Sequence, residues 1–309
     1  MALIKDCTIL DGGFATALSK LTGCSFEGDC LWSSRYLIKD PARVVEVHKN
    51  FIKAGAQIIE TNSYQAGIPT ITKEYKLSQD EAKNIVKNSV TLARTAVNEC
   101  STEGNSSKLW IAGSIGAYGS LLCDGSEYTG AYLNSVKHEN IINYYLDQAS
   151  ALIEESPDFL AFETIPSITE GDLILKALDK LQNSPPLWIS FSCKDQQHTS
   201  FGDFWAEAYR HFSGNPKVSA IGINCTAPQH ITPLLKTLTT QEKTKPIVVY
   251  PNSGEEWNHE SGWSGVTNFS IIDHVREWVE LGASTIGGCC RVYPKDIERI
   301  SSLLLQNVQ

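Results

Sequence analysis

Two adjacent thiols, Cys289 and Cys290, follow a short β-rich run and a pair of glycines. Neighbouring Cα atoms lie about 3.8 Å apart, whereas an unstrained disulfide needs roughly 5.5 Å. We therefore do not expect these two cysteines to bond each other. Two thiols on a rigid turn can instead bind one soft metal ion. Zinc needs further ligands, so the rest of the sequence should supply at least a third.

Eight short apolar segments alternate with helical patterns along the chain. This alternation is typical of a parallel sheet buried on both faces. Eight units predict an α/β protein with a single (β/α)8 TIM barrel over residues 1–309. The first segment is not followed by G-x-G-x-x-G, which weakens the dinucleotide-binding alternative. The expected strands are residues 7–13, 57–64, 109–116, 159–166, 186–193, 218–225, 246–252 and 284–290.

Helical spacing of apolar residues predicts a helix after each strand, and a polar loop is expected over residues 117–137. Long loops that follow strands lie at the C-terminal face of a barrel, where active sites of this fold are found. The expected helices are residues 42–54, 79–98, 138–155, 169–181, 204–212, 228–238, 271–281 and 294–304.

A third thiol, Cys225, ends the sixth expected strand, and the Cys289–Cys290 pair ends the eighth. Strands lie about 4.8 Å apart, so these positions begin roughly 10 Å apart and their side chains can converge. Three thiolates with one open position suit catalytic zinc. Cys193 and Cys123 are alternative third ligands. The other interpretation is that these cysteines are buried as small apolar residues.

A zinc ion held by three thiolates bears a net negative charge and activates water poorly. It suits the binding of a substrate thiol, whose proton is released on metal binding. A free thiol has a pKa of about 8.5 and is mostly protonated at neutral pH. The chemistry predicted for this site is attack of a thiolate on an electrophilic carbon.

Six motifs in chain order resemble the homocysteine S-methyltransferase family. They span residues 11–13, 60–66, 113–128, 162–166, 222–225 and 287–290. The resemblance covers nearly the whole chain. It implies a zinc-dependent barrel that methylates L-homocysteine to methionine. It also implies that Cys225, Cys289 and Cys290 bind zinc, and that Asp11 and Glu163 hold the amino-acid end of the substrate.

The expected carboxylates fit this substrate, because the ammonium of homocysteine needs an anionic partner once water is excluded. The amides of Gly12 and Gly13 could approach its carboxylate closely, since glycine has no Cβ. The alternatives are an ordinary Asp-Gly turn at Asp11 and a salt bridge within the mouth at Glu163.

The methyl donor is less well defined by the sequence. Residues 60–66 and 124–128 resemble the family branch that uses S-methylmethionine or S-adenosylmethionine, both sulfonium cations. Aromatic rings favour such cations, so Tyr64, Tyr118 and Tyr128 are donor-site candidates. Glu60 is a fourth candidate, or an internal hydrogen-bonding group. A betaine-dependent enzyme is the alternative; the chain lacks the long C-terminal extension of that branch.

The 309 residues carry a net charge of −9, which argues against a nucleic-acid surface. We find no signal peptide and no long apolar run, so we expect no membrane segment. Nine cysteines are too sparse for a disulfide scaffold, which predicts a reducing, cytoplasmic location. The expected assembly is a monomer or small homo-oligomer. Rival functions are a metal-dependent hydrolase and a non-catalytic barrel that senses zinc or thiols.

Overall fold

Eight parallel strands form the centre of the computed structural model, which describes residues 7–102, 108–239, 242–258, 262–264 and 269–305. The order in the sheet is β1-β10-β7-β6-β5-β4-β3-β2, and a parallel bridge between Leu10 and Ile58 joins its two edges. The predicted (β/α)8 barrel is confirmed. The strands are β1 (Thr8–Ile9), β2 (Ile58–Glu60), β3 (Trp110–Gly116), β4 (Phe159–Ile165), β5 (Leu187–Phe191), β6 (Val218–Asn224), β7 (Ile247–Tyr250) and β10 (Ala283–Ile286).

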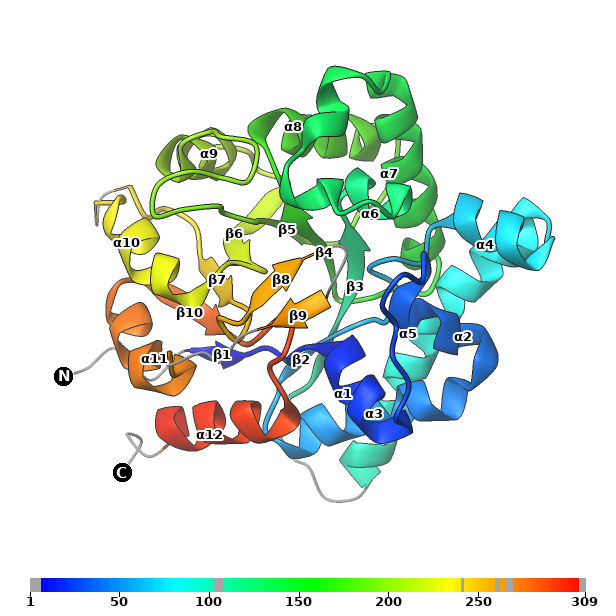
Figure 1. Cartoon of the computed structure of the whole chain (residues 1–309), viewed down its shortest axis with the longest axis horizontal. Coiled ribbons are helices and arrows are strands. Elements are labelled where there is room, and N and C mark those ends of the chain that lie inside the picture. The colour runs from blue at the N-terminus through cyan, green and yellow to red at the C-terminus, as the bar shows by residue number, and fades with distance from the viewer. Residues whose placement is uncertain (1–6, 103–107, 240–241, 259–261, 265–268, 306–309) are drawn as a thin grey trace.

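Helices surround the strands on the outside of the barrel (Figure 1). Each expected helix is present, with ends that differ by a few residues, and the sixth begins with a 3-10 turn, η4 (Pro228–His230). The eight are α3 (Pro41–Lys53), α5 (Gln79–Thr102), α7 (His138–Ile153), α8 (Ile168–Leu178), α9 (Trp205–Ser213), α10 (Ile231–Lys236), α11 (Ile271–Glu280) and α12 (Pro294–Leu305).

Several short elements occupy the connections at the barrel mouth. The expectation of a polar loop over residues 117–137 is wrong, because that segment folds into three short helices. A segment shorter than two turns shows no apolar period, so the sequence pattern does not reveal it. The additional elements are α1 (Phe14–Thr22), η1 (Trp32–Arg35), α2 (Tyr36–Lys39), α4 (Ile68–Tyr75), α6 (Tyr118–Leu122), η2 (Ser126–Tyr128), η3 (Ala131–Asn134), β8 (Glu256–Asn258) and β9 (Gly262–Ser264).

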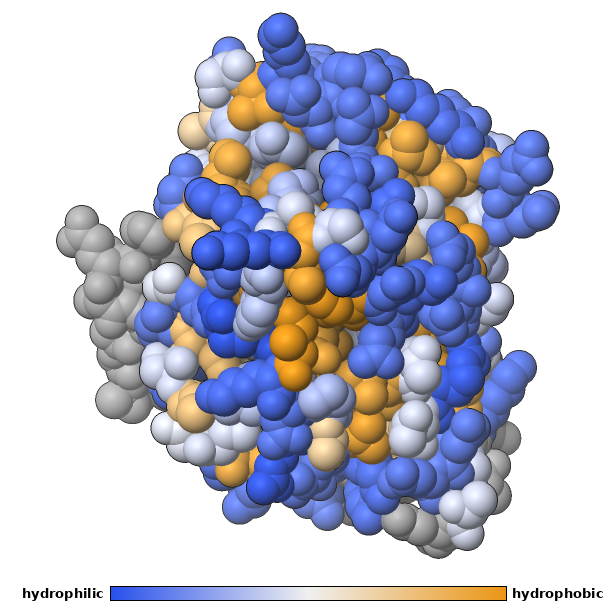
Figure 2. Space-filling model, turned by 90° about the vertical axis from the view of Figure 1, so that its right-hand side faces the viewer, coloured by the Kyte–Doolittle hydropathy of each residue, from blue (hydrophilic) through white to orange (hydrophobic). Residues whose placement is uncertain are grey.

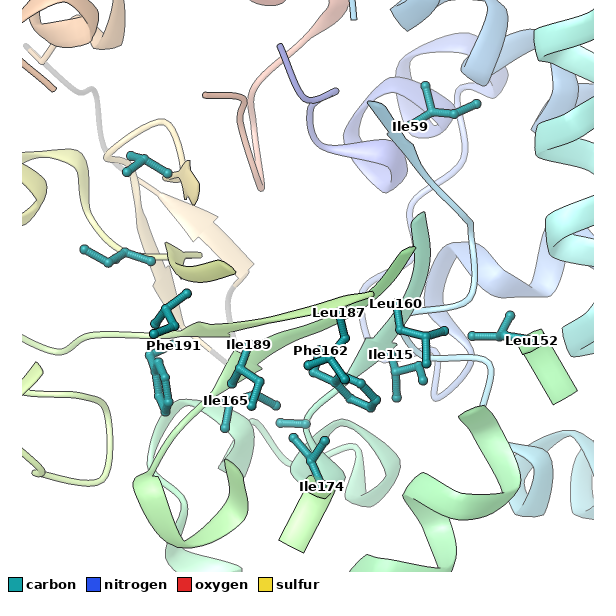
Figure 3. Packing of buried hydrophobic residues seen from close by; sticks show 14 of the residues in the cluster. Ile59, Ile115, Leu152, Leu160, Phe162, Ile165, Ile174, Leu187, Ile189 and Phe191 are labelled. Carbon is teal, nitrogen blue, oxygen red and sulfur yellow. The ribbon is translucent and has the colours of Figure 1, made fainter. Parts of the chain in front are cut away.

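The barrel is packed on both sides of its wall. Outside, Phe162 and Ile165 of β4 and Ile115 of β3 meet Leu152 of α7 and Ile174 of α8 (Figure 3). Burial of each such side chain contributes about 1.5–3 kcal/mol. Inside, the barrel is filled below the mouth, so the open space lies at its C-terminal end. The inner residues are Leu10, Ile58, Ala112, Ala161, Trp188, Val248 and Tyr250.

The outer surface is mostly hydrophilic. Figure 2 shows one side of the molecule, where hydrophobic side chains gather near the centre among hydrophilic ones. In the described part of the chain, the exposed large hydrophobic residues are Leu122, Phe201 and Phe204. None of the helices in these residues has the length and apolar character needed to cross a membrane.

Candidate active site

Three thiols meet at the C-terminal end of the barrel. Cys225 directly follows β6, and Cys289 and Cys290 follow β10. The Cys225 Sγ lies 2.8 Å from the Cys289 Sγ and 3.7 Å from the Cys290 Sγ. A tetrahedral zinc site with Zn–S bonds of about 2.3 Å requires sulfur atoms about 3.8 Å apart. The Cys225–Cys290 pair has this spacing, and Cys289 reaches it by moving outward by about 1 Å.

The backbone at the thiols is tightly constrained. Cys225 adopts a positive φ of 45°, a conformation that non-glycine residues rarely take. A Cβ on Gly13 would lie 2.5 Å from the carbonyl oxygen of Cys289, and one on Gly288 would clash with the side chain of Val292. The glycines of both motifs therefore let the β1 and β10 connections approach each other closely.

The three thiols also shift one another's pKa values. Hydrogen bonds from Cys289 and Cys290 lower the pKa of Cys225 well below its usual value. The same interactions raise the pKa of the other two thiols. The group therefore holds one thiolate readily and resists a second, unless a cation joins it. This donor set of three sulfurs fits a thiophilic divalent metal.

The two alternative third ligands lie outside this group. In the described residues, the set of His, Cys, Asp and Glu side chains that could hold a metal ion is Cys225, Cys289 and Cys290. The Cys193 thiol is buried, and its burial raises its pKa. Cys123 ends α6, where its thiol lies 3.8 Å from the carbonyl oxygen of Cys30.

Three carboxyl groups lie beside the thiols: those of Asp11 and Glu163, which are buried, and that of Glu60, which is half-buried. The amide of Glu60 donates to Asp11 Oδ2 (3.0 Å), and the hydroxyl of Ser114 donates to Glu163 Oε1. Asp11 Oδ1 and Glu60 Oε1 are buried without a hydrogen-bond partner among the described atoms. Burial raises the pKa of all three groups, that of Glu163 to about 8. A substrate cation would relieve this cost.

Asn224 fixes the position of the Glu163 backbone. Its Oδ1 accepts from the amide of Thr164 (2.8 Å), and its Nδ2 donates to the Thr164 hydroxyl (2.9 Å). Thr164 has a positive φ of 60°, which this pair of hydrogen bonds stabilises. The end of β6, which Cys225 follows, thereby holds the end of β4, which carries Glu163.

Two adjoining cavities open at the mouth. The inner cavity contains the three thiols and the three carboxyl groups. The outer cavity continues from it, and both are lined by Trp32, Tyr64, Tyr128 and Cys290. The Trp32 and Tyr64 rings meet edge to face at 6.1 Å, and the Tyr128 hydroxyl lies 3.5 Å from the Cys225 Sγ. Aromatic rings therefore separate the cavities.

The four residues predicted for the methyl-donor site do not all line the same cavity. Tyr64 and Tyr128 line both cavities, whereas Glu60 lines the inner one. Tyr118 packs against Tyr132 and Tyr144, with ring centroids 5.7 and 5.6 Å apart. The structure therefore brings Tyr64 and Tyr128 to a common wall and places Tyr118 in an aromatic cluster. Trp32, which the sequence interpretation missed, completes that wall.

The start of α1 differs from expectation. The Gly13 amide donates to the carbonyl of Val292 (2.9 Å), so it is already used within the fold. Phe14 and Ala15, the first residues of α1, line the inner cavity, and the helix has no side-chain N-cap. Their amides are the groups that a helix offers to an anion. A glycine pair directly before an amphipathic helix was the sequence signal for this site.

Known proteins resemble this chain over nearly its whole length. The sequence model of the family described as Homocysteine S-methyltransferase matches residues 8–304. Homocysteine S-methyltransferase 1 of Brassica oleracea var. italica is 37% identical, over 97% of this chain and 96% of that protein. Betaine-homocysteine S-methyltransferase of Drosophila melanogaster is 35% identical, over 95% of this chain and 92% of that protein.

A solved structure gives the same result. The crystal structure of the homocysteine methyltransferase MmuM from Escherichia coli, in its metallated form, matches with a TM-score of 0.84 and 34% identity, covering 96% of each chain. The fold, the gathered thiols and both kinds of comparison agree. The chain is an enzyme that belongs to the homocysteine S-methyltransferase family.

Proposed function

We propose that this enzyme transfers a methyl group from a sulfonium donor, S-methylmethionine or S-adenosylmethionine, to the sulfur of L-homocysteine, giving methionine, with Zn²⁺ as cofactor. The observation that carries the proposal is that three thiols and three carboxyl groups line one cavity, beside a wall of aromatic rings.

Cys225, Cys289 and Cys290 would hold the zinc ion. Their sulfur-only donor set suits zinc, and the metallated MmuM structure supports a metal in this family. When bound, zinc makes the homocysteine sulfur a thiolate at neutral pH, although a free thiol has a pKa of about 8.5. The site needs reduced thiols, and all nine cysteines are free, which supports a cytoplasmic location.

The inner cavity would bind the amino-acid end of homocysteine. Asp11 and Glu163 accept hydrogen bonds from its ammonium, and Glu60 adds negative charge beside them. The amides of Phe14 and Ala15 at the start of α1 donate to its carboxylate. Both ends of the amino acid are thus held, which aims its sulfur at the donor methyl group and lowers the entropic cost of reaction.

The outer cavity favours a donor with net positive charge. Its wall contains the carboxylates of Glu27, Asp29 and Glu127, and the described residues that line it include no lysine, arginine or histidine. S-methylmethionine and S-adenosylmethionine each carry one net positive charge, whereas betaine is neutral overall. The rings of Trp32, Tyr64 and Tyr128 add favourable cation–π contacts for a sulfonium group.

Betaine is the second candidate donor, because the Drosophila relative is a betaine-homocysteine S-methyltransferase at 35% identity. A direct assay separates the donors. The purified zinc-loaded enzyme is given homocysteine with S-methylmethionine, S-adenosylmethionine or betaine, and methionine is measured. We expect kcat/KM for a sulfonium donor to exceed that for betaine by at least about 100-fold. Equal or faster reaction with betaine would contradict the proposed donor.

A further inference from the structure

We propose that Glu127 binds the α-ammonium group of the methyl donor, so that the enzyme selects sulfonium compounds that are amino acids over sulfonium compounds that lack an amino group. This inference rests on the proposed function and deepens it, because it assigns a specificity-determining residue to the outer cavity.

The first observation is an unpaired buried oxygen. Glu127 lies in η2 and lines the outer cavity, and its Oε2 is buried without a hydrogen-bond partner among the described atoms. Tyr64 lines the same cavity, and after burial the charge of Glu127 is the largest cause of the raised pKa of that tyrosine. Burial also raises the pKa of Glu127, to about 7. A buried carboxylate in this position is stabilised by a ligand cation.

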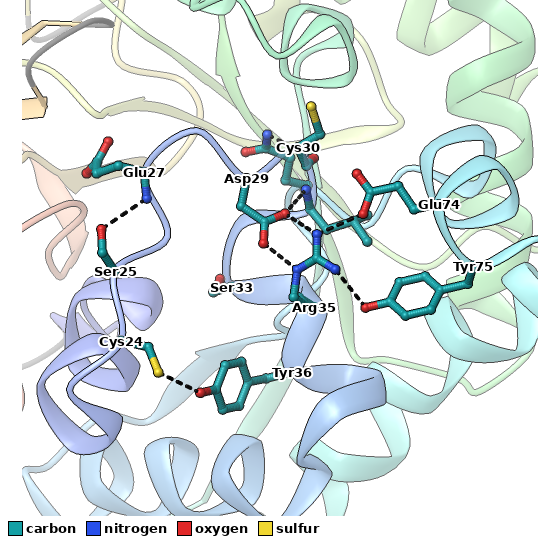
Figure 4. A network of polar contacts seen from close by, with 12 residues as sticks. Cys24, Ser25, Glu27, Asp29, Cys30, Ser33, Arg35, Tyr36, Glu74 and Tyr75 are labelled. Carbon is teal, nitrogen blue, oxygen red and sulfur yellow. Dashed lines mark hydrogen bonds and ion pairs between the residues drawn. The ribbon is translucent and has the colours of Figure 1, made fainter.

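The other acids of the outer cavity are less suited to this role. Arg35 holds Asp29 through both of its oxygens and also donates to Glu74 (2.7 Å) and to Tyr75 (2.9 Å), as Figure 4 shows. The charge of Asp29 is therefore compensated within the protein. Glu27 is exposed, so water competes for its carboxylate. Among these three acids, Glu127 is the half-buried one whose Oε2 is buried without a hydrogen-bond partner among the described atoms, so this oxygen is available to the methyl donor.

The surrounding backbone fixes Glu127 in place. Gly125 and Gly130, at either side of η2, have positive φ values of 76° and 68°. The Gly130 amide donates to the carbonyl of Ser126 (2.7 Å). A Cβ on Gly119 of α6 would clash with the amide nitrogen of Glu127. The carboxylate is thus positioned before the donor arrives, which favours discrimination between ligands.

The test compares two donors that differ in one group. S-methylmethionine is assayed against (3-carboxypropyl)dimethylsulfonium, the same chain without the α-amino group, at saturating homocysteine. We expect wild-type kcat/KM to favour S-methylmethionine by about 100-fold. Glu127→Gln should lower kcat/KM for S-methylmethionine by about 10- to 100-fold, the range for a hydrogen bond to a charged group. It should change kcat/KM for the desamino donor by less than about threefold.

The matched control is Asp124→Asn. This residue is an exposed carboxylate in the same segment, and an Asn oxygen can keep the hydrogen bond that Asp124 accepts from the Ser126 amide (2.9 Å). We expect the control to behave as wild type with both donors. Zinc content and melting temperature are measured for each variant, and Glu127→Asp, which keeps the charge, should retain part of the preference.

Two results would overturn the inference. They are equal use of both donors by wild type, and an unchanged preference in Glu127→Gln, which includes an equal loss with both donors. The wild-type comparison needs no variant, so it can overturn the inference even if Glu127→Gln does not fold. If wild type makes no methionine from S-methylmethionine, the proposed function fails as well. If wild type does so and Glu127→Gln retains its preference, only the role of Glu127 fails.

Discussion

The Glu163 side chain lies where three strands meet at the barrel mouth. β4 carries it, Ser114 of β3 donates to it, and Asn224 of β6 holds the adjoining Thr164. Its burial raises its pKa from 4.5 to about 8. In the proposed function, the ammonium of the substrate would offset this cost.

The raised pKa of Glu163 predicts a pH-dependent stability. Between about 4.5 and 8, the native protein holds a proton that the unfolded chain releases. The stabilisation from this proton is fully present below 4.5 and is lost as the pH rises through about 8. The side chain in Glu163→Gln cannot ionise. The stability of this variant relative to wild type should therefore increase as the pH rises from about 4.5 to 8. Urea unfolding of the metal-free, reduced proteins at several pH values measures it; a pH-independent difference would contradict the prediction.

At the scale of elements, the connections after β1 and β10 position the thiols. Each contains a glycine pair, and each pair packs against the other connection: Gly13 against Cys289, and Gly287 against the carbonyl of Asp11. The Gly288 amide also donates to that carbonyl (2.9 Å). Asp11 and the Cys289–Cys290 pair are therefore held by these two interlocked turns.

Gly288→Ala should disturb the metal site without unfolding the barrel. The new methyl group would clash with Val292, so the Cys289–Cys290 turn has to shift. We expect zinc affinity to fall by at least about tenfold, in the range seen when the residues that orient metal ligands are altered. Competition with a chelator measures the affinity. Gly214→Ala is the matched control, because a Cβ there meets nothing within 4 Å; equal affinities in the two variants would refute the prediction.

The strands were predictable because buried parallel strands are mostly apolar, as β3 and β4 are apart from a few polar residues such as Ser114 and Glu163. The barrel then brought Cys225 and Cys289 together by topology alone. Two residues of the outer cavity, Trp32 and Glu127, could not be foreseen in this way. Trp32 and Glu127 lie in one-turn helices whose geometry depends on positive-φ glycines and on packing against other loops. Such contacts leave no period in the sequence.

The hydrogen-bond partners of individual backbone amides could not be predicted from the sequence either. Gly13 was expected to offer its amide to substrate, but that amide donates to Val292, nearly at the other end of the chain. Tyr118 and Tyr128 are both tyrosines of the same connection, yet α6 turns the first toward Tyr144 while η2 brings the second to Cys225. The orientation of each short helix therefore decides whether its tyrosine lines a cavity, as Tyr128 does, or packs against other rings, as Tyr118 does.

At the scale of the whole molecule, the barrel has two adjoining cavities at its mouth. The inner cavity contains thiols and carboxyl groups from the ends of β1, β2, β4, β6 and β10. The outer cavity is built mainly from the connections after β1, β2 and β3, with Cys290 from the connection after β10. In the proposed reaction, the acceptor sulfur and the donor methyl group would meet at the aromatic wall between the cavities.

X-ray absorption at the zinc edge is a direct test of the metal site proposed for Cys225, Cys289 and Cys290. We predict one zinc ion per chain with three sulfur ligands at about 2.3 Å and a fourth, lighter ligand. Adding L-homocysteine should raise the sulfur count to four, and Cys290→Ala should lose the metal. A protein that binds no zinc, or whose zinc keeps the same ligands when homocysteine is added, would contradict the proposed role of zinc in binding the substrate sulfur.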